Sequence, residues 1–289
     1  MHEPFIGSEA LAARSLTRGA LRWNYTALYP DVYIHKDARI DIHDRARAAW
    51  LWTGRKGVIA GTTAAALYGV GSIDTNATIE LIAPPRRARP GVVVRTERIG
   101  SDEVEAGPLP CTTPARTALD LARRLPRDEA VVLLDQLSEC TDVSAADVAP
   151  LEARYRSARG TGSAWEAIRL MDGGSRSPEE TRLRLMLIDG GLPRPRTSIF
   201  VEDDSYNFAT MDDQPWGVAI GMGWVDAKVG VEWAAHRRAL RADIDFKKLL
   251  QQKGWLLIEV THLDTRGSTI RRCKDALRQR WGRLAAPNM

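Results

Sequence analysis

The chain has little cysteine and lacks several motifs that identify enzymes. Its three cysteines, Cys111, Cys140 and Cys273, lie far apart among 289 residues. An odd number at wide spacing is not typical of a disulfide framework or a metal cluster. It favours a reducing compartment, and we expect a cytoplasmic protein. The sequence contains no Gly-rich phosphate-binding loop, no His-Glu-x-x-His pair and no internal repeat, which excludes several enzyme classes.

Long apolar runs are also missing from the sequence. None approaches the ~20 residues that cross a bilayer, so we expect no membrane association. The length of 289 residues suits two domains, each with its own core. Hydrophobic residues make up 44% and charged residues 27%, as is typical of a globular protein, and the net charge of +4 permits nucleic-acid binding without requiring it.

The predicted elements indicate a mixed α/β (α+β) protein in three parts. Residues 1–75 are predicted to be a winged-helix DNA-binding domain, and residues 76–160 a mixed α/β extension. Residues 175–284 are predicted to form a mixed sheet flanked by helices. The glycines of Gly160-Thr161-Gly162 are typical of a linker, and the boundary between the N-terminal and C-terminal parts is predicted to lie between residues 159 and 175.

The winged helix is predicted from the order of elements in residues 5–35. A helix over 8–13, capped by Ser8, is followed by a helix over 17–24, and a turn and strand at 29–34 would form the wing. The helical period directs Leu16, Ala20, Leu21 and Trp23 toward the core. Arginine and asparagine read guanine and adenine in the major groove. The candidate DNA-binding residues are therefore Thr17, Arg18, Arg22 and Asn24. A small helical domain with ordinary surface arginines is the alternative.

Two further basic segments are candidates for phosphate contacts. The loop 84–90 joins two predicted strands and carries Arg86 and Arg87. The last predicted helix belongs to a segment, residues 266–283, with seven basic residues and one acid. Its candidates are Arg271, Arg272, Lys274 and Arg278. A solvated turn and a solvated terminal helix are the respective alternatives.

Three motifs in the first half resemble a known family. The segments Phe5–Leu11, Leu28–Tyr33 and Thr112–Ala122 are similar to AbiEi-type antitoxin and regulator proteins. The resemblance covers roughly residues 1–150. It implies that the winged helix binds operator DNA, and that the following domain, as in some members, neutralises a nucleotidyltransferase-type toxin.

The stretch from Gly221 to His236 carries the candidate chemistry of the second half. Side chains alternate between apolar and polar from Val225 to Trp233, which predicts a strand with one face on a core. A carboxylate near the end of such a strand, here Glu232, followed by a histidine is typical of metal-dependent nucleases. An edge strand with a solvated polar face is the alternative.

This stretch resembles the Vsr-like endonucleases, a branch of the PD-(D/E)XK superfamily. The match covers roughly residues 175–281, and it implies a restriction-endonuclease-like mixed sheet flanked by helices. The matching residues are Met222-Gly223-Trp224, Lys228–Glu232, His236, Asp243-Ile244 and Gly254-Trp255. A glutamate of the family also stands at the position of Glu180, although Ser177-Pro178 before it predicts a helix cap as its simpler role.

The departures from the family pattern predict that its metal site is lost. Gly221 stands where the family has its first metal-binding aspartate, and Trp233-Ala234-Ala235 replaces Tyr-Asp-Gly. One carboxylate holds Mg²⁺ poorly. Glu232, His236 and Glu180 are therefore expected to be remnants of a catalytic site, and no cofactor is expected.

These patterns predict a regulator or antitoxin that binds double-stranded DNA and carries a degenerate nuclease-like domain. A nucleotidyltransferase-type toxin is a candidate partner. One alternative is an active endodeoxyribonuclease, in which Asp226 substitutes for the missing ligand and shares Mg²⁺ with Glu232. Another alternative is a protein-binding module without a role on DNA.

Overall fold

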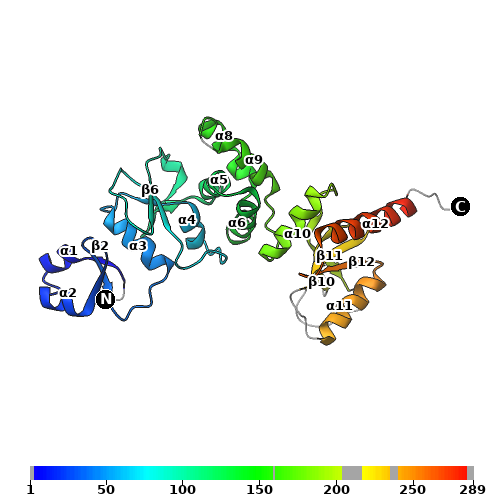
Figure 1. Ribbon diagram of the computed structural model, residues 1–289, viewed down its shortest axis with the longest axis horizontal. Helices are drawn as coiled ribbons and strands as arrows, with labels where there is room; N and C mark the ends of the chain where they lie inside the picture. Colours follow the sequence, from blue (N-terminus) through cyan, green and yellow to red (C-terminus); the bar gives the residue numbers. More distant parts are fainter. Residues whose placement is uncertain (1–2, 159, 204–216, 235–239, 285–289) are drawn as a thin grey trace. The chain divides into compact units, whose positions relative to one another are not determined.

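The computed structural model describes residues 3–158, 160–203, 217–234 and 240–284. The chain divides into two compact units, Met1–Met171 and Asp172–Met289 (Figure 1). The first unit contains a three-stranded and a five-stranded sheet, and the second contains a four-stranded sheet. Helices accompany all three sheets, which confirms the mixed α/β prediction.

The first unit begins with a small sheet and two short helices. Strand β3 is central, and β1 and β2 pair with it in antiparallel fashion. Leu21 of α2 and Val32 and Ile34 of β3 supply buried side chains. The elements are β1 (Phe5–Ile6), α1 (Gly7–Ala12), α2 (Arg18–Asn24), β2 (Tyr25–Tyr29) and β3 (Val32–His35).

Two expectations for this region are wrong. Helix α1 begins at Gly7, so Ser8 is not its cap; instead the Asp31 carboxylate accepts a hydrogen bond from the Ser8 amide at 2.9 Å. Asp31 lies in the turn between β2 and β3 with φ of 64°, and its carbonyl accepts from the Gly7 amide. The turn expected to be a wing is thus tied to α1. Trp23, which was expected to face the core, points outward instead, and 73% of its surface is exposed.

Helix α3 (Ile42–Trp52) joins the small sheet to the rest of the first unit. The Asp41 side chain accepts from the Asp44 amide at 2.8 Å, and Asp44 reciprocates, so a complete capping box starts the helix. One face of the helix packs Ala48 and Leu51 against Val32. Another face packs Ala46 and Ala49 among the buried side chains of the five-stranded sheet.

The five-stranded sheet has the order β6-β5-β4-β8-β7. The pairs β5–β6 and β4–β8 are parallel, and β4–β5 and β7–β8 are antiparallel. The helices that follow pack on one another as a bundle. Its elements are β4 (Val58–Ile59), α4 (Gly61–Leu67), β5 (Ile79–Ile82), β6 (Val92–Arg95), a 3-10 turn (Ser101–Glu103), β7 (Val104–Glu105), β8 (Cys111–Thr112), α5 (Pro114–Arg124), α6 (Arg127–Thr141), α7 (Ala145–Val148), α8 (Pro150–Tyr155) and α9 (Thr161–Leu170).

The observed division between Met171 and Asp172 lies within the predicted range of 159–175, but the boundary predicted at residue 75 and the predicted linker at 160–162 fall within the folded first unit. A cut between residues 75 and 76 would separate β4 from β5, which are paired in one sheet. The expected linker at Gly160-Thr161-Gly162 is the start of α9. Ala164, Ala167 and Ile168 of that helix are buried, and α9 packs on α5 and α6. The first unit therefore continues to residue 171.

The second unit is a four-stranded sheet covered on both faces (Figure 1). The order is β12-β11-β10-β9, and β11–β12 is its parallel pair. Helices α10 and α12 cover one face through Leu183, Leu187, Cys273 and Leu277. Helix α11 covers the other through Phe246 and Leu250. The elements are α10 (Pro178–Asp189), β9 (Arg196–Glu202), β10 (Gly217–Trp224), β11 (Val229–Trp233), α11 (Leu240–Gln252), β12 (Leu256–Val260) and α12 (Arg266–Leu284).

The alternating stretch 225–233 is not one strand, as its pattern predicted. Strand β10 ends at Trp224, and a turn from Val225 to Lys228 leads into β11. The Lys228 amide donates to the Val225 carbonyl at 3.0 Å, and Lys228 has φ of 49°. Strands β10 and β11 form a hairpin, with Met222 opposite Val231.

Candidate functional site

The candidate DNA contacts of the first unit lie together on α2. Thr17 is the N-cap, and its Oγ1 accepts from the Ala20 amide at 3.1 Å. The side chains of Arg18, Arg22 and Asn24 are exposed. Among the described residues, no carboxylate forms an ion pair with Arg18 or Arg22. Both guanidinium groups are therefore available to an anionic ligand.

Lys36 fixes the end of this helix and adds a positive charge beside it. Its Nζ donates to the carbonyl oxygens of Arg22 at 3.3 Å and Trp23 at 2.7 Å. These carbonyls belong to the last turn of α2, where helix acceptors otherwise lack partners. The helix ends in a defined position although it has only seven residues.

The two arginines of the basic loop differ in their surroundings. The Arg86 guanidinium lies 5.6 Å from the centre of the Trp52 ring and donates to the Thr53 carbonyl. The Trp52 ring itself stacks on Tyr29 at 5.5 Å. Arg86 is thus held against the protein, and Arg87 is exposed. The loop offers Arg87 more readily than Arg86 as a phosphate contact.

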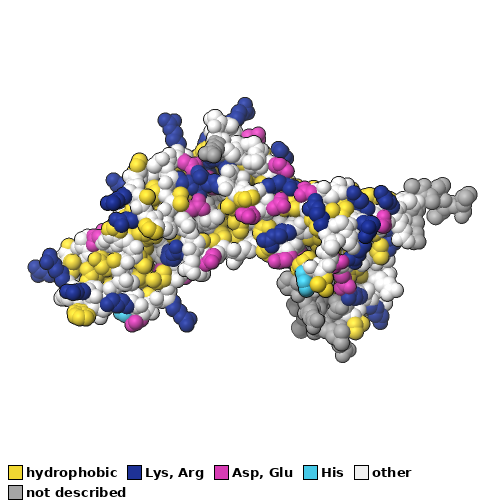
Figure 2. All heavy atoms as spheres, viewed as in Figure 1, with side chains coloured by type: hydrophobic (Ala, Val, Ile, Leu, Met, Phe, Trp, Pro, Cys, Tyr) yellow, Lys and Arg dark blue, Asp and Glu magenta, His cyan; other side chains and the backbone are white. Residues whose placement is uncertain are grey.

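The basic side chains of α12 are partly committed to internal ion pairs. Arg272 pairs with Asp264 at 2.9 Å, and Arg278 pairs with Asp275 at 3.5 Å. Arg271 is exposed and Lys274 is half-buried. Lys and Arg side chains nevertheless gather on the surface of this helix (Figure 2). Arg271 is the one of the four predicted contacts that is exposed and forms no ion pair with a carboxylate of the described residues.

Glu180 and Glu232, two residues of the predicted nuclease site, lie close to each other in the second unit. Glu180 lies at the start of α10, where the Ser177 hydroxyl accepts from its amide at 3.2 Å. Glu232 lies on β11, and the Gly221 amide of β10 donates to its Oε2 at 2.7 Å. The two side chains are 6% and 11% exposed, respectively, so both carboxylates are largely removed from water.

An arginine that the sequence did not reveal bridges these two glutamates. Nη2 of Arg176 lies 3.3 Å from Glu180 Oε1 and 3.2 Å from Glu232 Oε1. The Arg176 amide also donates to Glu180 Oε2 at 2.9 Å. One guanidinium therefore supplies the positive charge that two buried carboxylates need. We call Arg176, Glu180, Gly221 and Glu232 the remnant site, after the expectation from the sequence that the two glutamates are remnants of a catalytic site.

The residues of the remnant site do not fit Mg²⁺. A Cβ at Gly221 would lie 3.2 Å from Glu180 Oε1 and 3.3 Å from Glu232 Oε2, so an aspartate there would complete a triad, and glycine offers no side-chain oxygen. Mg²⁺ requires several oxygen ligands, and the Arg176 cation would repel it. The described residues contain no cluster of three or more possible metal ligands.

Two other residues of the predicted nuclease site do not join this group. Asp226 lies in the turn between β10 and β11, beyond the three residue pairs that separate this turn from Glu232, so it is more than about 10 Å away along the hairpin. The geometry therefore gives no support to a metal shared by Asp226 and Glu232. His236 lies outside the described residues.

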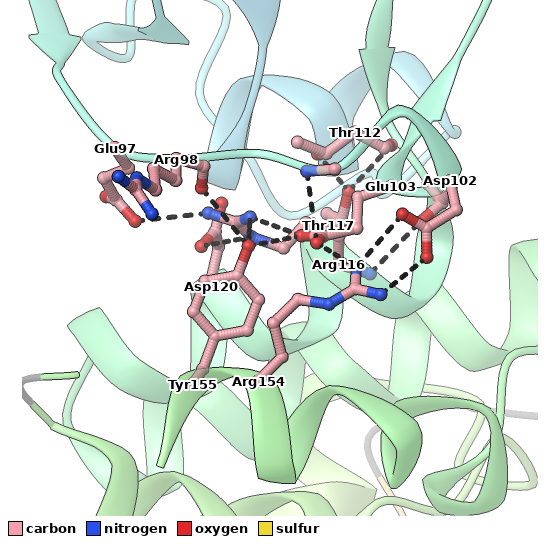
Figure 3. Close-up of polar contacts among 12 residues, drawn as sticks. Glu97, Arg98, Asp102, Glu103, Thr112, Arg116, Thr117, Asp120, Arg154 and Tyr155 are labelled. Carbon is pink, nitrogen blue, oxygen red and sulfur yellow. Dashed lines mark hydrogen bonds and ion pairs between the residues drawn. The ribbon is translucent and has the colours of Figure 1, made fainter. Parts of the chain in front are cut away.

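A second polar cluster, around Arg116 in the first unit, was missed in the sequence. Arg116 of α5 is fully buried and forms ion pairs with Glu97 at 3.2 Å, Glu103 at 2.5 Å and Asp120 at 3.1 Å (Figure 3). It also donates to the Tyr155 hydroxyl at 2.6 Å. Four segments that are distant in sequence thus converge on one guanidinium.

Outer arginines balance the carboxylates of this cluster. Arg95 of β6 pairs with Asp120 at 2.9 Å and with Glu80 of β5. Arg154 of α8 pairs with Asp102 at 2.9 Å and with Glu103. The cluster ties α8 and strands β5 and β6 to α5. A buried ion pair is favourable only when its members are fully hydrogen-bonded, as most are here.

The pKa values of the cluster favour its charged form. Burial raises the pKa of Glu103, but hydrogen bonds from Tyr155, Arg116 and Arg154 outweigh it and lower the pKa below 4.5. Burial lowers the pKa of Arg116, and the Asp120 and Glu103 carboxylates more than offset this, so its pKa is raised. The spacing of Arg116 and Asp120, one helical turn apart, was the available sequence signal.

A shallow groove of about 750 Å³ adjoins this cluster. Arg98, Arg123 and Arg124 line it together with Glu97 and Tyr155. Glu97 is engaged with Arg116 at 3.2 Å and with Arg124. The groove therefore has a basic lining, formed by residues between Glu97 and Gly160.

Comparison with known proteins relates the first unit to antitoxins. Residues 57–172 match the family model of the AbiEi antitoxin C-terminal domain. Two Mycobacterium tuberculosis proteins, uncharacterized protein Rv2248 (strain ATCC 25618 / H37Rv) and uncharacterized protein MT2308 (strain CDC 1551 / Oshkosh), are each 29% identical over 233 residues, which cover 78% of this chain and 82% of theirs.

Among solved structures, the crystal structure of RV2827C protein from Mycobacterium tuberculosis matches with a TM-score of 0.39 and 15% identity, over 63% of this chain and 75% of that one. None of the helices in the described residues is both long and apolar enough to cross a membrane. The part of this chain from β4 to α9 is therefore similar to the AbiEi antitoxin C-terminal domain.

Proposed function

We propose that this protein is a DNA-binding regulator of a toxin–antitoxin pair. The observation that carries the proposal is α2, a helix capped at Thr17 whose exposed arginines have no carboxylate partner among the described residues. The succession β1-α1-α2-β2-β3, with β3 between β1 and β2, supports a winged-helix assignment. The match of residues 57–172 supports the antitoxin assignment.

In this proposal the winged helix binds double-stranded DNA through α2. Arg18, Arg22 and Asn24 contact base edges and phosphates, and Arg87 and Arg271 add contacts to the phosphate backbone. The helical part of the first unit binds a nucleotidyltransferase-type toxin. Because phosphate contacts release counterions, DNA affinity should fall steeply as salt rises.

The second unit acts in this proposal as a nuclease-like fold without nuclease chemistry. The sheet order β9-β10-β11-β12 with helices on both faces supports the nuclease-like assignment. The absence of a side chain at Gly221 and the ion pairs of Arg176 with both glutamates support loss of the metal. This unit is left with contacts to DNA or to a partner through α12.

A gel-shift titration against a pool of random duplexes, repeated at several salt concentrations, tests DNA binding. We expect Arg18→Ala and Arg22→Ala each to weaken binding. Each should also reduce the slope of log affinity against log salt concentration by about one. Arg156→Ala, an exposed arginine after α8, is the matched control and should bind as the wild type does. If the wild type gives no shift, a protein-binding role without DNA replaces the proposal.

Incubation with supercoiled plasmid and Mg²⁺ or Mn²⁺ tests the nuclease alternative. The proposal expects intact plasmid under conditions where the gel shift is complete. Cleavage that is abolished in Glu232→Ala would instead establish an active nuclease. Cleavage that persists in Glu232→Ala would indicate a contaminating enzyme, and the purified preparation would then be tested again.

A further inference from the structure

Trp23 lies at the centre of the outward face of α2. Leu21 is the buried residue of this helix, and at 100° per residue Trp23 is about 200° around the axis from it. Its exposed fraction of 73% is high for so large an apolar side chain. The Lys36 ammonium holds the Trp23 carbonyl at 2.7 Å, so the indole stands on a fixed backbone. Exposure is therefore built into this position.

Gly19 lies one turn before Trp23 on the same face. A Cβ placed on Gly19 would have only Thr17 Oγ1 near it, at 3.8 Å, so the space in front of the helix is open. The bare backbone at Gly19 allows another molecule to approach the helix axis closely. The outward face thus consists of a flat glycine surface followed by one large aromatic side chain.

The charges around this face indicate an anionic partner. Arg18 and Arg22 lie on one flank of the Gly19–Trp23 ridge, and Lys36 lies at its end. Neither arginine is neutralised by a described carboxylate. Double-stranded DNA combines a polyanionic backbone with apolar thymine methyl groups in the major groove.

We propose that Trp23 contacts thymine methyl groups in the major groove of double-stranded DNA, and that Gly19 lets α2 enter the groove deeply. This rests on the proposed function and adds a contact that salt does not weaken. Buried aromatic side chains surrounded by charged ones often dominate the affinity of an interface. Arg18 and Arg22 supply the electrostatic part of the affinity, and Trp23 supplies an apolar part.

A gel-shift titration of full-length Trp23→Ala over a range of salt concentrations tests the proposal. We expect affinity to fall about tenfold at every salt concentration, with an unchanged salt slope. Trp23→Phe should recover part of the loss. Phe200→Ala, a 53% exposed aromatic residue on β9, is the matched control and should bind as the wild type does. Trp23→Ala that binds like the wild type would overturn the proposal.

A duplex with deoxyuridine in place of thymidine removes the methyl groups alone. Wild-type protein should bind it more weakly than the thymidine duplex, and Trp23→Ala should bind both equally. An equal loss in both proteins would overturn the thymine contact. If the wild-type protein binds no DNA, the proposed function itself is wrong. If sedimentation shows a wild-type dimer that dissociates in Trp23→Ala, Trp23 contacts a second copy of the chain instead of DNA.

Discussion

Arg176 and Glu232 form an ion pair of 3.2 Å across the remnant site, between the start of α10 and strand β11. The same guanidinium nitrogen reaches Glu180 at 3.3 Å. Two carboxylates that could have bound a divalent ion are thereby satisfied by a cation belonging to the chain. The chain can therefore keep both acidic residues here without an unpaired buried charge.

The first prediction is that two substitutions will create a divalent metal site here. Gly221→Asp adds the third carboxylate, and Arg176→Ala removes the competing charge. We expect the double variant to gain thermal stability in millimolar Mn²⁺, because a ligand that binds the native state stabilises it. The wild type should show no such gain.

Arg176→Ala combined with Gly221→Asn is the matched control for this metal prediction. Asparagine has the shape of aspartate without its charge, so the control should respond weakly or not at all to Mn²⁺. A wild type that Mn²⁺ stabilises as much as the double variant would show that Arg176 does not replace the metal.

The second prediction concerns the stability contributed by Arg116. Arg116→Met keeps much of the side-chain volume but leaves the buried Glu103 and Asp120 without their shared partner. Breaking a buried ion pair in this way costs about 3–5 kcal/mol of unfolding free energy. Urea unfolding followed by circular dichroism measures the loss. Arg87→Ala, on the exposed loop, should leave the unfolding midpoint unchanged.

The third prediction is a loss of stability in acid that depends on Glu103. Its pKa is lower in the folded protein than the usual 4.5. Its carboxylate therefore stabilises the fold above about pH 4.5, and this contribution is lost as the pH falls through the folded-state pKa. Glu103→Gln should be less stable at pH 7 and should lose less on acidification. Urea midpoints between pH 7 and pH 3 measure both effects, and parallel curves for the two proteins would refute the assignment.

The fourth prediction separates the three thiols. Cys140 is exposed, and Cys111 and Cys273 are buried. Burial raises the pKa of the Cys273 thiol to about 11, so little thiolate forms at pH 8. We expect a thiol-specific chromogenic reagent to modify Cys140 rapidly in the native protein and all three cysteines after denaturation. Cys140→Ser should abolish the rapid phase.

Local signals in the sequence were sufficient to predict two of the helices. Thr17 and Ser177 each accept a hydrogen bond from the amide three residues later, as capping residues do, and each precedes a helix. These predictions depend on residues close together in the chain, so the pattern alone contained the information.

The turn after β10 could not be located by the same reasoning. Val225 to Lys228 contains Asp226 as its one residue typical of turns, and the alternation of apolar and polar side chains continues through it. Lys228 instead adopts the left-handed conformation with φ of 49°. Ala227 is buried beneath the turn with the core that α10 and α12 cover, so tertiary packing outweighed the local strand pattern.

The two polar clusters were beyond prediction because their members are remote in sequence. Arg116 meets Tyr155, which lies 39 residues away, and Arg176 meets Glu232, which lies 56 residues away. No spacing rule connects such pairs. Glu180 and Glu232 entered the prediction only through the family resemblance, and their shared contact with Arg176 was not predicted.

The packing of α9 on α5 and α6 determines where the antitoxin-like half can be separated from the rest. An expression fragment that ends at residue 160 lacks the helix that carries Ala164, Ala167 and Ile168. The apolar surface of α5 and α6 beneath that helix would then be exposed to water. Such a product should be recovered in inclusion bodies. Extending the fragment to Met171 retains α9, and this longer fragment is suitable for testing the proposed binding of a toxin.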